Sequence, residues 1–207
     1  MKIKILLITV VFLLGLTALQ SVNLDESYGK MLAAYGKLNS WQAEIRQTNY
    51  FKDSETTLNS TGNFYYQKGR IAIRYDKPNE QYLLVQDGRV TVYDKSARTA
   101  VRTKLTAQVQ SLDPVQIIKT YWEGSEKTIV AGKNNQLTIT LVPGLDKQVK
   151  KLVFNLDSRT GYVNQLSYTD AQDNSVGLSF IKTKFNQKIP DSVWKLPIPP
   201  NVKIMEF

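Results

Sequence analysis

Histidine and cysteine carry much of the catalytic and metal-binding chemistry of proteins, and this chain of 207 residues contains neither. Their absence excludes Ser-His-Asp and Cys-His catalysis as well as the usual zinc sites. The glycine-rich motifs that cradle phosphates in nucleotide-binding proteins are also missing from the sequence. The chemistry left to the chain is that of carboxylate, amine and hydroxyl groups.

The densest acidic stretch, Asp170-Ala-Gln-Asp173-Asn174, has the residue types of a calcium loop. It lacks the central glycine and the closing glutamate of an EF-hand, and it falls between two predicted strands, so we interpret it as a hairpin turn. A glycosidase needs only two carboxylates, but nothing in the sequence positions such a pair. We therefore predict a protein that is not an enzyme and that has no metal site and no cofactor.

The first 20 residues have the layout of a secretory signal peptide. Lys2 and Lys4 precede an apolar run of about 15 residues, which is shorter than the roughly 20 that a membrane-spanning helix needs. No cysteine follows the run, so the chain cannot be anchored through an acylated cysteine. We expect cleavage after residues 1–20 and export of one domain, residues 21–207. An uncleaved membrane anchor is the alternative.

The formal net charge is +9, and the basic residues are scattered singly apart from Lys150-Lys151. A scattered excess favours weak attraction to anionic surfaces such as lipid headgroups or acidic partners. The alternative is a soluble surface with a positive bias. An exported chain without a basic stripe is not expected to bind nucleic acid. Without cysteine, its stability must come from the core.

Two segments show the spacing of amphipathic helices. Residues 24–38 place apolar side chains three and four positions apart, with Asn23 as a plausible N-cap. Residues 112–122 have Asp113 at the N-cap and Pro114 at the first helical position, and their apolar edge includes Val115, Ile118 and Trp122.

Most of the remaining chain alternates with the period of two that is typical of strands. The stretch RIAIRYDKPNEQYLLVQDGRVTVYDK (70–95) predicts three strands joined by turns at Pro78-Asn79 and Asp87-Gly88. Two long strands precede it, and further strands are predicted at 99–103, 128–131, 136–142, 149–156, 163–169, 176–184 and 202–205. About 11 strands at meander spacing predict an antiparallel barrel or a strongly curved sheet, mainly β, accompanied by two helices.

Several strands are apolar on both faces, which exceeds the need of a sheet with one solvated side. A large curled sheet with helices across its mouth encloses either a filled core or a pocket for an apolar ligand.

Short motifs recur along the chain in a fixed order. They are S-W-Q-A-x-I-x-Q-T (40–48), G-N-F-Y-Y-Q-K (62–68), R-I-A-I-R-Y-x-x-P-x-E-Q (70–81), L-L-V-x-D-G continuing to V-Y-D (83–94), and W-x-L through Pro199 to V-x-I (194–204). In this order and spacing they resemble the LolA family, the periplasmic carriers of outer-membrane lipoproteins. The resemblance covers roughly residues 24–205.

The resemblance implies an unclosed antiparallel β-barrel capped by a helical lid, with acyl chains held between barrel and lid. The family pattern, together with the alternation, predicts a cavity lined by Ile45, Phe64, Tyr66, Ile71, Ile73, Tyr75, Leu83 and Val85, facing Ile117, Ile118 and Trp122. In the family a strand-end arginine holds the lid closed. Lys68 corresponds to it here, and Arg70 is the competing assignment.

The function implied by the resemblance is transport through the periplasm. The protein, expected to be a monomer, would take acylated lipoproteins from an inner-membrane lipoprotein-releasing exporter and deliver them to an outer-membrane acceptor. One alternative is a sensor or regulator of the same fold, whose known examples carry a second domain, so that a chain ending at Phe207 disfavours it. The other is a carrier of another lipid.

Overall fold

The computed structural model describes residues 23–105, 114–144 and 146–207. The predicted signal peptide (1–20) and the predicted N-cap Asp113 lie outside these residues, and so does the side chain of Ile117. Within the described ranges, no helix is both long and apolar enough to cross a bilayer.

The described chain is mainly β. Its elements, in chain order, are α1 (Leu24–Gly36), β1 (Ser40–Phe51), β2 (Thr56–Gln67), β3 (Arg70–Lys77), β4 (Gln81–Gln86), β5 (Arg89–Asp94), β6 (Thr99–Lys104), α2 (Pro114–Glu123), β7 (Ser125–Ala131), β8 (Gln136–Pro143), β9 (Val149–Asp157), β10 (Val163–Asp170), β11 (Ser175–Phe185), the 3-10 helix η2 (Asp191–Trp194) and β12 (Ile204–Glu206). Each predicted strand and both predicted helices are confirmed, with ends that shift by a few residues.

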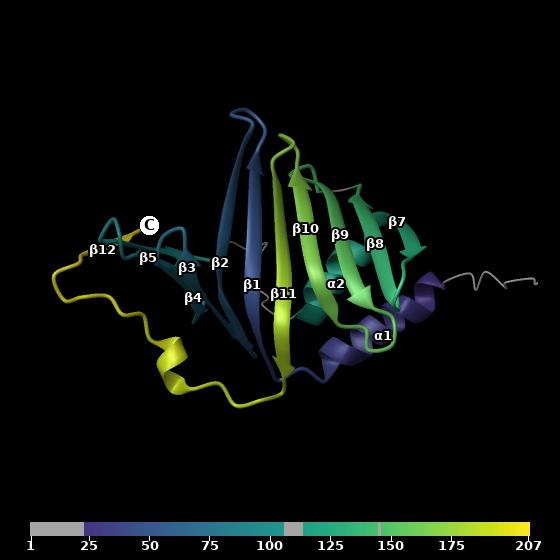
Figure 1. The fold of residues 1–207 in the computed structure, drawn as a ribbon, viewed down its shortest axis with the longest axis horizontal. Coiled ribbons are helices and arrows are strands. Elements are labelled where there is room, and N and C mark those ends of the chain that lie inside the picture. The colour runs from purple at the N-terminus through teal and green to yellow at the C-terminus, as the bar shows by residue number, and fades with distance from the viewer. Residues whose placement is uncertain (1–22, 106–113, 145) are drawn as a thin grey trace, which may run out of the picture.

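All strands belong to one open sheet in the order β12-β6-β5-β4-β3-β2-β1-β11-β10-β9-β8-β7 (Figure 1). Neighbouring strands are antiparallel except β12, which pairs with β6 in parallel. The sheet has 12 strands where about 11 were expected, and it does not close, so the prediction of an unclosed half-barrel is confirmed. The long strands β1 and β11 form its centre.

Local turn chemistry sets the register of the hairpins. Asp87 and Gly88 both have positive φ (53° and 68°), the backbone of a tight two-residue hairpin whose twist matches that of β4 and β5. The acidic stretch after β10 is also a hairpin turn: the Asp170 carboxylate accepts hydrogen bonds from the backbone N–H groups of Gln172 and Asn174, both at 2.9 Å. The prediction of a hairpin turn at residues 170–174 is therefore confirmed.

Helices α1 and α2 cover one face of the sheet, over the strands β7 to β11 (Figure 1). We call this side the helix face. The main core lies between the helices and this face, and it includes Met31, Ile45, Ile139, Leu141 and Leu156, which are almost wholly buried.

On the opposite side, the outer face, the C-terminal segment covers strands β2 to β6. Ile189, Val193 and Trp194 pack on Ala72 of β3, and Tyr65 and Leu84 border them. Further along, Val202 packs on Tyr93 and Ala100 before β12 joins the sheet. This coverage explains why strands β2 to β6 are apolar on both faces.

Candidate functional site

An apolar cavity of about 210 Å³ lies between the helices and the helix face of the sheet. It is lined by residues from α1, α2 and six strands: Tyr35, Trp41, Phe64, Tyr66, Ile71, Ile118, Phe154, Val163, Leu166, Leu178 and Phe180. No lining residue carries a carboxylate, an amine or a guanidinium group. The wall is therefore suited to bury hydrocarbon and offers no group for proton transfer at neutral pH.

Aromatic rings of the cavity wall gather around Trp41 at the start of β1. The indole lies 4.3 Å from Phe180, 5.0 Å from Phe64 and 6.0 Å from Tyr35, measured between ring centroids. The Phe64 and Tyr35 contacts are edge-to-face, the arrangement that aromatic quadrupoles favour. Trp41 pairs across the sheet with Tyr66 on β2 and with Phe185 on β11, and the Phe185 ring centroid lies 5.8 Å away.

The structure brings four of the residues predicted from the sequence to this cavity: Phe64, Tyr66, Ile71 and Ile118 line it. Three others belong to the same core without lining the cavity. Ile45 is buried, and Ile73 and Tyr75 are partly buried against it. The Tyr75 hydroxyl donates to Gln47 Oε1 at 2.7 Å.

The remaining predicted residues whose side chains the structure describes lie outside the cavity wall. Leu83 and Val85 are paired with Ile73 and Ile71, so they share the helix face, but they stand on β4, outside the cavity wall. Trp122 is buried and stacks on Tyr28 with ring centroids 4.2 Å apart.

Sequence reasoning missed the wall that comes from the second half of the chain, namely Phe154, Val163, Leu166, Leu178 and Phe180, as well as Tyr35 and Trp41. The period-two alternation of β9 and β11 contained this signal. What alternation does not show is which half of the sheet the helices cover, and both helices lie over the second half (Figure 1).

The two candidates for a lid latch lie in different places. Lys68 is exposed in the turn after β2, and its backbone N–H donates to Asn39 O just beyond α1, at 3.3 Å. Arg70 alternates with Ile71 and therefore points to the outer face, where its guanidinium carbon lies 4.1 Å from the centre of the Trp194 ring. Its Nη2 also donates to Gln67. Lys68 thus lies beside the end of α1, whereas Arg70 contacts the C-terminal segment.

Helix α1 is capped at its start and is fixed to the sheet by polar contacts near its C-terminal end. Asn23 caps its start, where its side chain accepts from the N–H of Asp25 at 2.9 Å. The side chain of Asn186 bridges its end, accepting from Asn39 N and donating to Lys37 O. In between, the Tyr35 hydroxyl accepts from Val163 N at 3.2 Å.

Helix α2 is held differently. Its Trp122 stacks on Tyr28 of α1, and the Tyr121 hydroxyl donates to Asp146 over a longer distance of 3.3 Å. The pKa of Tyr121 is raised, first by burial and then by the charge of Asp146. The Lys127 ammonium lies 5.7 Å from the Trp122 ring.

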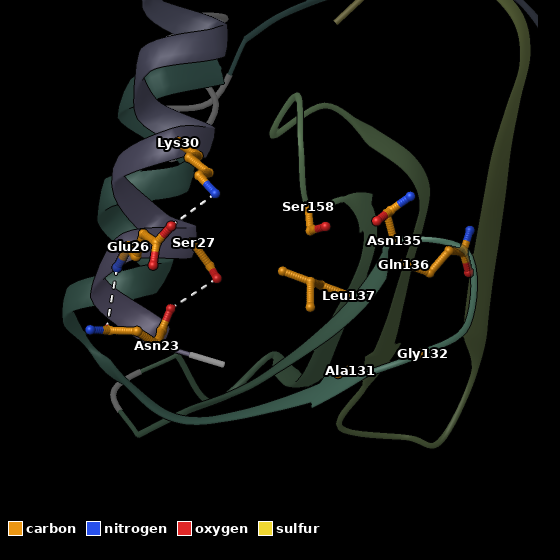
Figure 2. A pocket seen from close by; sticks show the side chains of 10 residues that line it. All are labelled: Asn23, Glu26, Ser27, Lys30, Ala131, Gly132, Asn135, Gln136, Leu137 and Ser158. Atoms are coloured by element: carbon orange, nitrogen blue, oxygen red, sulfur yellow. Dashed lines mark hydrogen bonds and ion pairs between the residues drawn. The ribbon is translucent and has the colours of Figure 1, made fainter. Parts of the chain in front are cut away.

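A second, larger cleft of about 630 Å³ lies at the start of α1 (Figure 2). Its side chains are mostly polar, and those on α1 pair with one another: Lys30 forms an ion pair with Glu26 at 2.9 Å, and Ser27 donates to Asn23 O. Ser158, Asn135 and Gln136 border its other side (Figure 2). A hydrocarbon chain gains less from this polar cleft than from the apolar cavity.

Known proteins share this architecture. The model of the family described as outer membrane lipoprotein carrier protein LolA matches residues 36–197. No curated protein matches the sequence.

Solved structures share the fold at low sequence identity. An uncharacterized conserved protein from Thermus thermophilus is 8% identical with a TM-score of 0.57, over 88% of this chain and 98% of that one. A chain of the MucA/MucB complex from Pseudomonas aeruginosa is 14% identical with a TM-score of 0.52, over 83% of this chain and 61% of that one. MucB alone gives a TM-score of 0.53 at 14% identity, over 85% of this chain and 64% of that one. The chain therefore spans less than two thirds of the MucB length.

Proposed function

This chain belongs to the LolA family of outer membrane lipoprotein carriers, and on that premise we propose that it shields the acyl chains of lipoproteins during their passage through the periplasm. It takes them from an inner-membrane lipoprotein-releasing exporter and delivers them to an outer-membrane acceptor, and no covalent bond is made or broken. The observation that carries this proposal is the uncharged, largely aromatic and aliphatic wall of the cavity under the helices.

The size of the cavity determines how cargo enters. A dry apolar cavity of about 150 Å³ holds one benzene molecule, so a volume of about 210 Å³ accommodates only part of an acyl chain. Complete acyl chains therefore require that a helix move. We propose α2 as the moving element, because its hydrogen bond from Tyr121 to Asp146 is long (3.3 Å), whereas α1 is tied to the sheet through Tyr35 and, just beyond its end, through Asn186.

The energetics favour binding and make release the difficult step. Each buried methylene contributes about 0.8 kcal/mol, so affinity rises quickly with chain length. Closure of α2 over the emptied cavity recovers the contacts of Trp122 and Ile118 with the core, and this recovery offsets part of the lost acyl contacts. An acceptor therefore needs to bind the cargo only moderately more tightly than the carrier does.

A displacement assay tests the proposal. An apolar fluorescent probe bound in the cavity should be displaced by a triacylated lipopeptide and not by the same peptide without acyl chains. Leu178→Gln, in the cavity wall, should weaken probe binding, whereas Leu58→Gln, at an exposed position of β2 outside the wall, should not. Equal displacement by both peptides contradicts acyl binding.

Transfer separates the carrier from its alternatives. Loaded protein mixed with outer-membrane vesicles should lose its lipopeptide to them. Binding without transfer indicates a sensor of acylated ligands, and co-purification of free lipids, identified by mass spectrometry, indicates a carrier of another lipid.

A further inference from the structure

One polar atom in the cavity wall has no partner. The side chain of Trp41 is buried, with 6% of its surface exposed, and its neighbours are the rings of Phe180, Phe64, Phe185 and Tyr35. Its indole Nε1 forms no hydrogen bond with any described residue.

This orphan donor is unusual for its setting. A buried indole N–H normally finds an acceptor, because leaving it unpaired costs the full desolvation of the group. The hydroxyl group of Tyr35, also in the wall, accepts a hydrogen bond from Val163 N. Among the described wall residues, Trp41 is the one whose buried side-chain nitrogen or oxygen lacks a partner.

We propose that the indole N–H of Trp41 donates a hydrogen bond to the carbonyl oxygen of a fatty acyl ester or amide, so that the cavity prefers acyl esters and amides to bare hydrocarbon chains. The inference rests on the proposed function and names the ligand group that the site recognises. A hydrocarbon ligand leaves the N–H buried and unpaired, whereas a carbonyl within about 3 Å of Nε1 pairs it. The hydrogen bond therefore stabilises the complex with an acyl ester or amide and not the complex with a bare hydrocarbon.

The position of Trp41 also orients the chain. Along the sheet, Trp41 is level with Phe185, whereas Leu178 is level with Gln47, six positions further along β1. Leu166 faces Leu178 from β10, and both line the cavity. With its carbonyl at Trp41, an acyl chain extends along β10 and β11 over these two leucines. In the empty cavity the surrounding rings cover the N–H, and the entering chain displaces them.

Ester and ether lipids test the inference, because they differ in the carbonyl groups alone. Short-chain diacyl phosphatidylglycerol should displace the apolar probe about five to ten times better than the dialkyl ether analogue of equal chain length, as expected for one net hydrogen bond. Trp41→Phe should abolish this preference. Trp194→Phe is the matched control, because Trp194 is also buried with an unpaired Nε1 but lies on the outer face; it should keep the preference.

The wild-type protein supplies a second readout that needs no variant. The indole ¹H–¹⁵N signal of Trp41 should move further downfield with the ester lipid than with the ether lipid at saturation, because both chains displace the surrounding rings but only the ester supplies a carbonyl acceptor. A triacylated lipopeptide, compared with the phospholipid at equal chain length, shows which source of acyl carbonyl is preferred. Equal binding of ester and ether lipids, or a preference that survives in Trp41→Phe, overturns the role of Trp41 and leaves acyl binding intact. If neither the lipids nor the lipopeptide bind, both the role of Trp41 and the proposed function are contradicted.

Discussion

The hydroxyl group of Tyr35 in α1 accepts a hydrogen bond from the backbone N–H of Val163 at the start of β10, over 3.2 Å. Both residues are buried in the cavity wall, and burial raises the pKa of the Tyr35 phenol, so the phenol stays neutral. One contact thus fixes α1 to the half of the sheet that forms most of the cavity.

Tyr35→Phe should lower the free energy of unfolding by about 1–3 kcal/mol, because the mutation leaves a buried N–H without an acceptor. Urea unfolding followed by tryptophan fluorescence measures the loss. Tyr162→Phe is the control: its hydroxyl donates to Ala34 O at 3.3 Å from a partly exposed position, so a smaller loss is expected. Equal losses in the two variants contradict the anchoring role of Tyr35.

Gly161→Ala should destabilise the protein more than Gly69→Ala does. Both glycines have positive φ, 75° and 87°, and this conformation costs an alanine roughly 1–2 kcal/mol. A Cβ at Gly161 would also lie 2.7 Å from the carbonyl of Lys30 in α1, whereas a Cβ at Gly69 meets nothing within 4 Å. The extra loss, about 1–3 kcal/mol for overpacking, is read from the difference in urea midpoints. No difference would mean that the turn after β9 does not press on α1.

Lys68→Leu should leave the protein folded and able to bind a lipopeptide, but slow the transfer of cargo to acceptor vesicles. Lys68 lies next to Asn39, just beyond the end of α1. As a latch it requires that this end of α1 loosen together with α2, and a charge-assisted hydrogen bond of about 1.5–3 kcal/mol from its ammonium to a helix-end carbonyl then changes the ratio of open to closed forms about ten- to a hundredfold. Arg70→Leu should transfer normally, because its contacts lie on the outer face. If Lys68→Leu transfers at the wild-type rate, Lys68 is only a solvated turn residue.

Stability should be flat between pH 5 and 8, because the sequence contains no histidine, and should fall below pH 4. Hydrogen bonds, first from Ala97 N and then from Ser96, hold the pKa of Asp94 at about 2, against 3.8 for a free carboxyl group. The side chain of Arg159 is the main reason why the pKa of Asp157 is also about 2. Each carboxylate therefore stabilises the fold above pH 3.8, and this contribution is lost as the pH falls towards 2.

Urea midpoints measured from pH 7 to pH 2 test this dependence. Asp94→Asn and Asp157→Asn should each be less stable than the wild type at pH 7 and should lose less stability on acidification. An unchanged acid dependence in both variants contradicts the assignment of these two groups.

The strands could be predicted from the sequence because alternation and turn residues are local properties. Asp87-Gly88 determines its own hairpin, and Ile71 and Ile73 identify a buried face without reference to the rest of the chain. The family pattern then supplied what local signals lack, namely that the sheet remains open.

The site could be predicted only in part, since it depends on contacts between distant segments. Leu166 and Leu178 line the cavity because α1 and α2 lie over the second half of the sheet, and no periodicity encodes that choice. Arg70 illustrates the same limit: its sequence neighbours place it near the lid, but strand alternation turns it to Trp194, a residue from the end of the chain.

The central position of β11 also affects how the chain folds. Next to the β1–β11 pair, the hydroxyl of Ser40 donates to the carbonyl of Gln187, 147 residues further along the chain. Contacts this distant give a high contact order, and because the cost of closing such a loop is met before the contact forms, they slow folding. The middle of the sheet forms only after β11 has left the ribosome, so most of the chain is synthesised before its core can assemble. A chain with this strand order therefore stays unfolded for longer than one built from neighbouring hairpins alone.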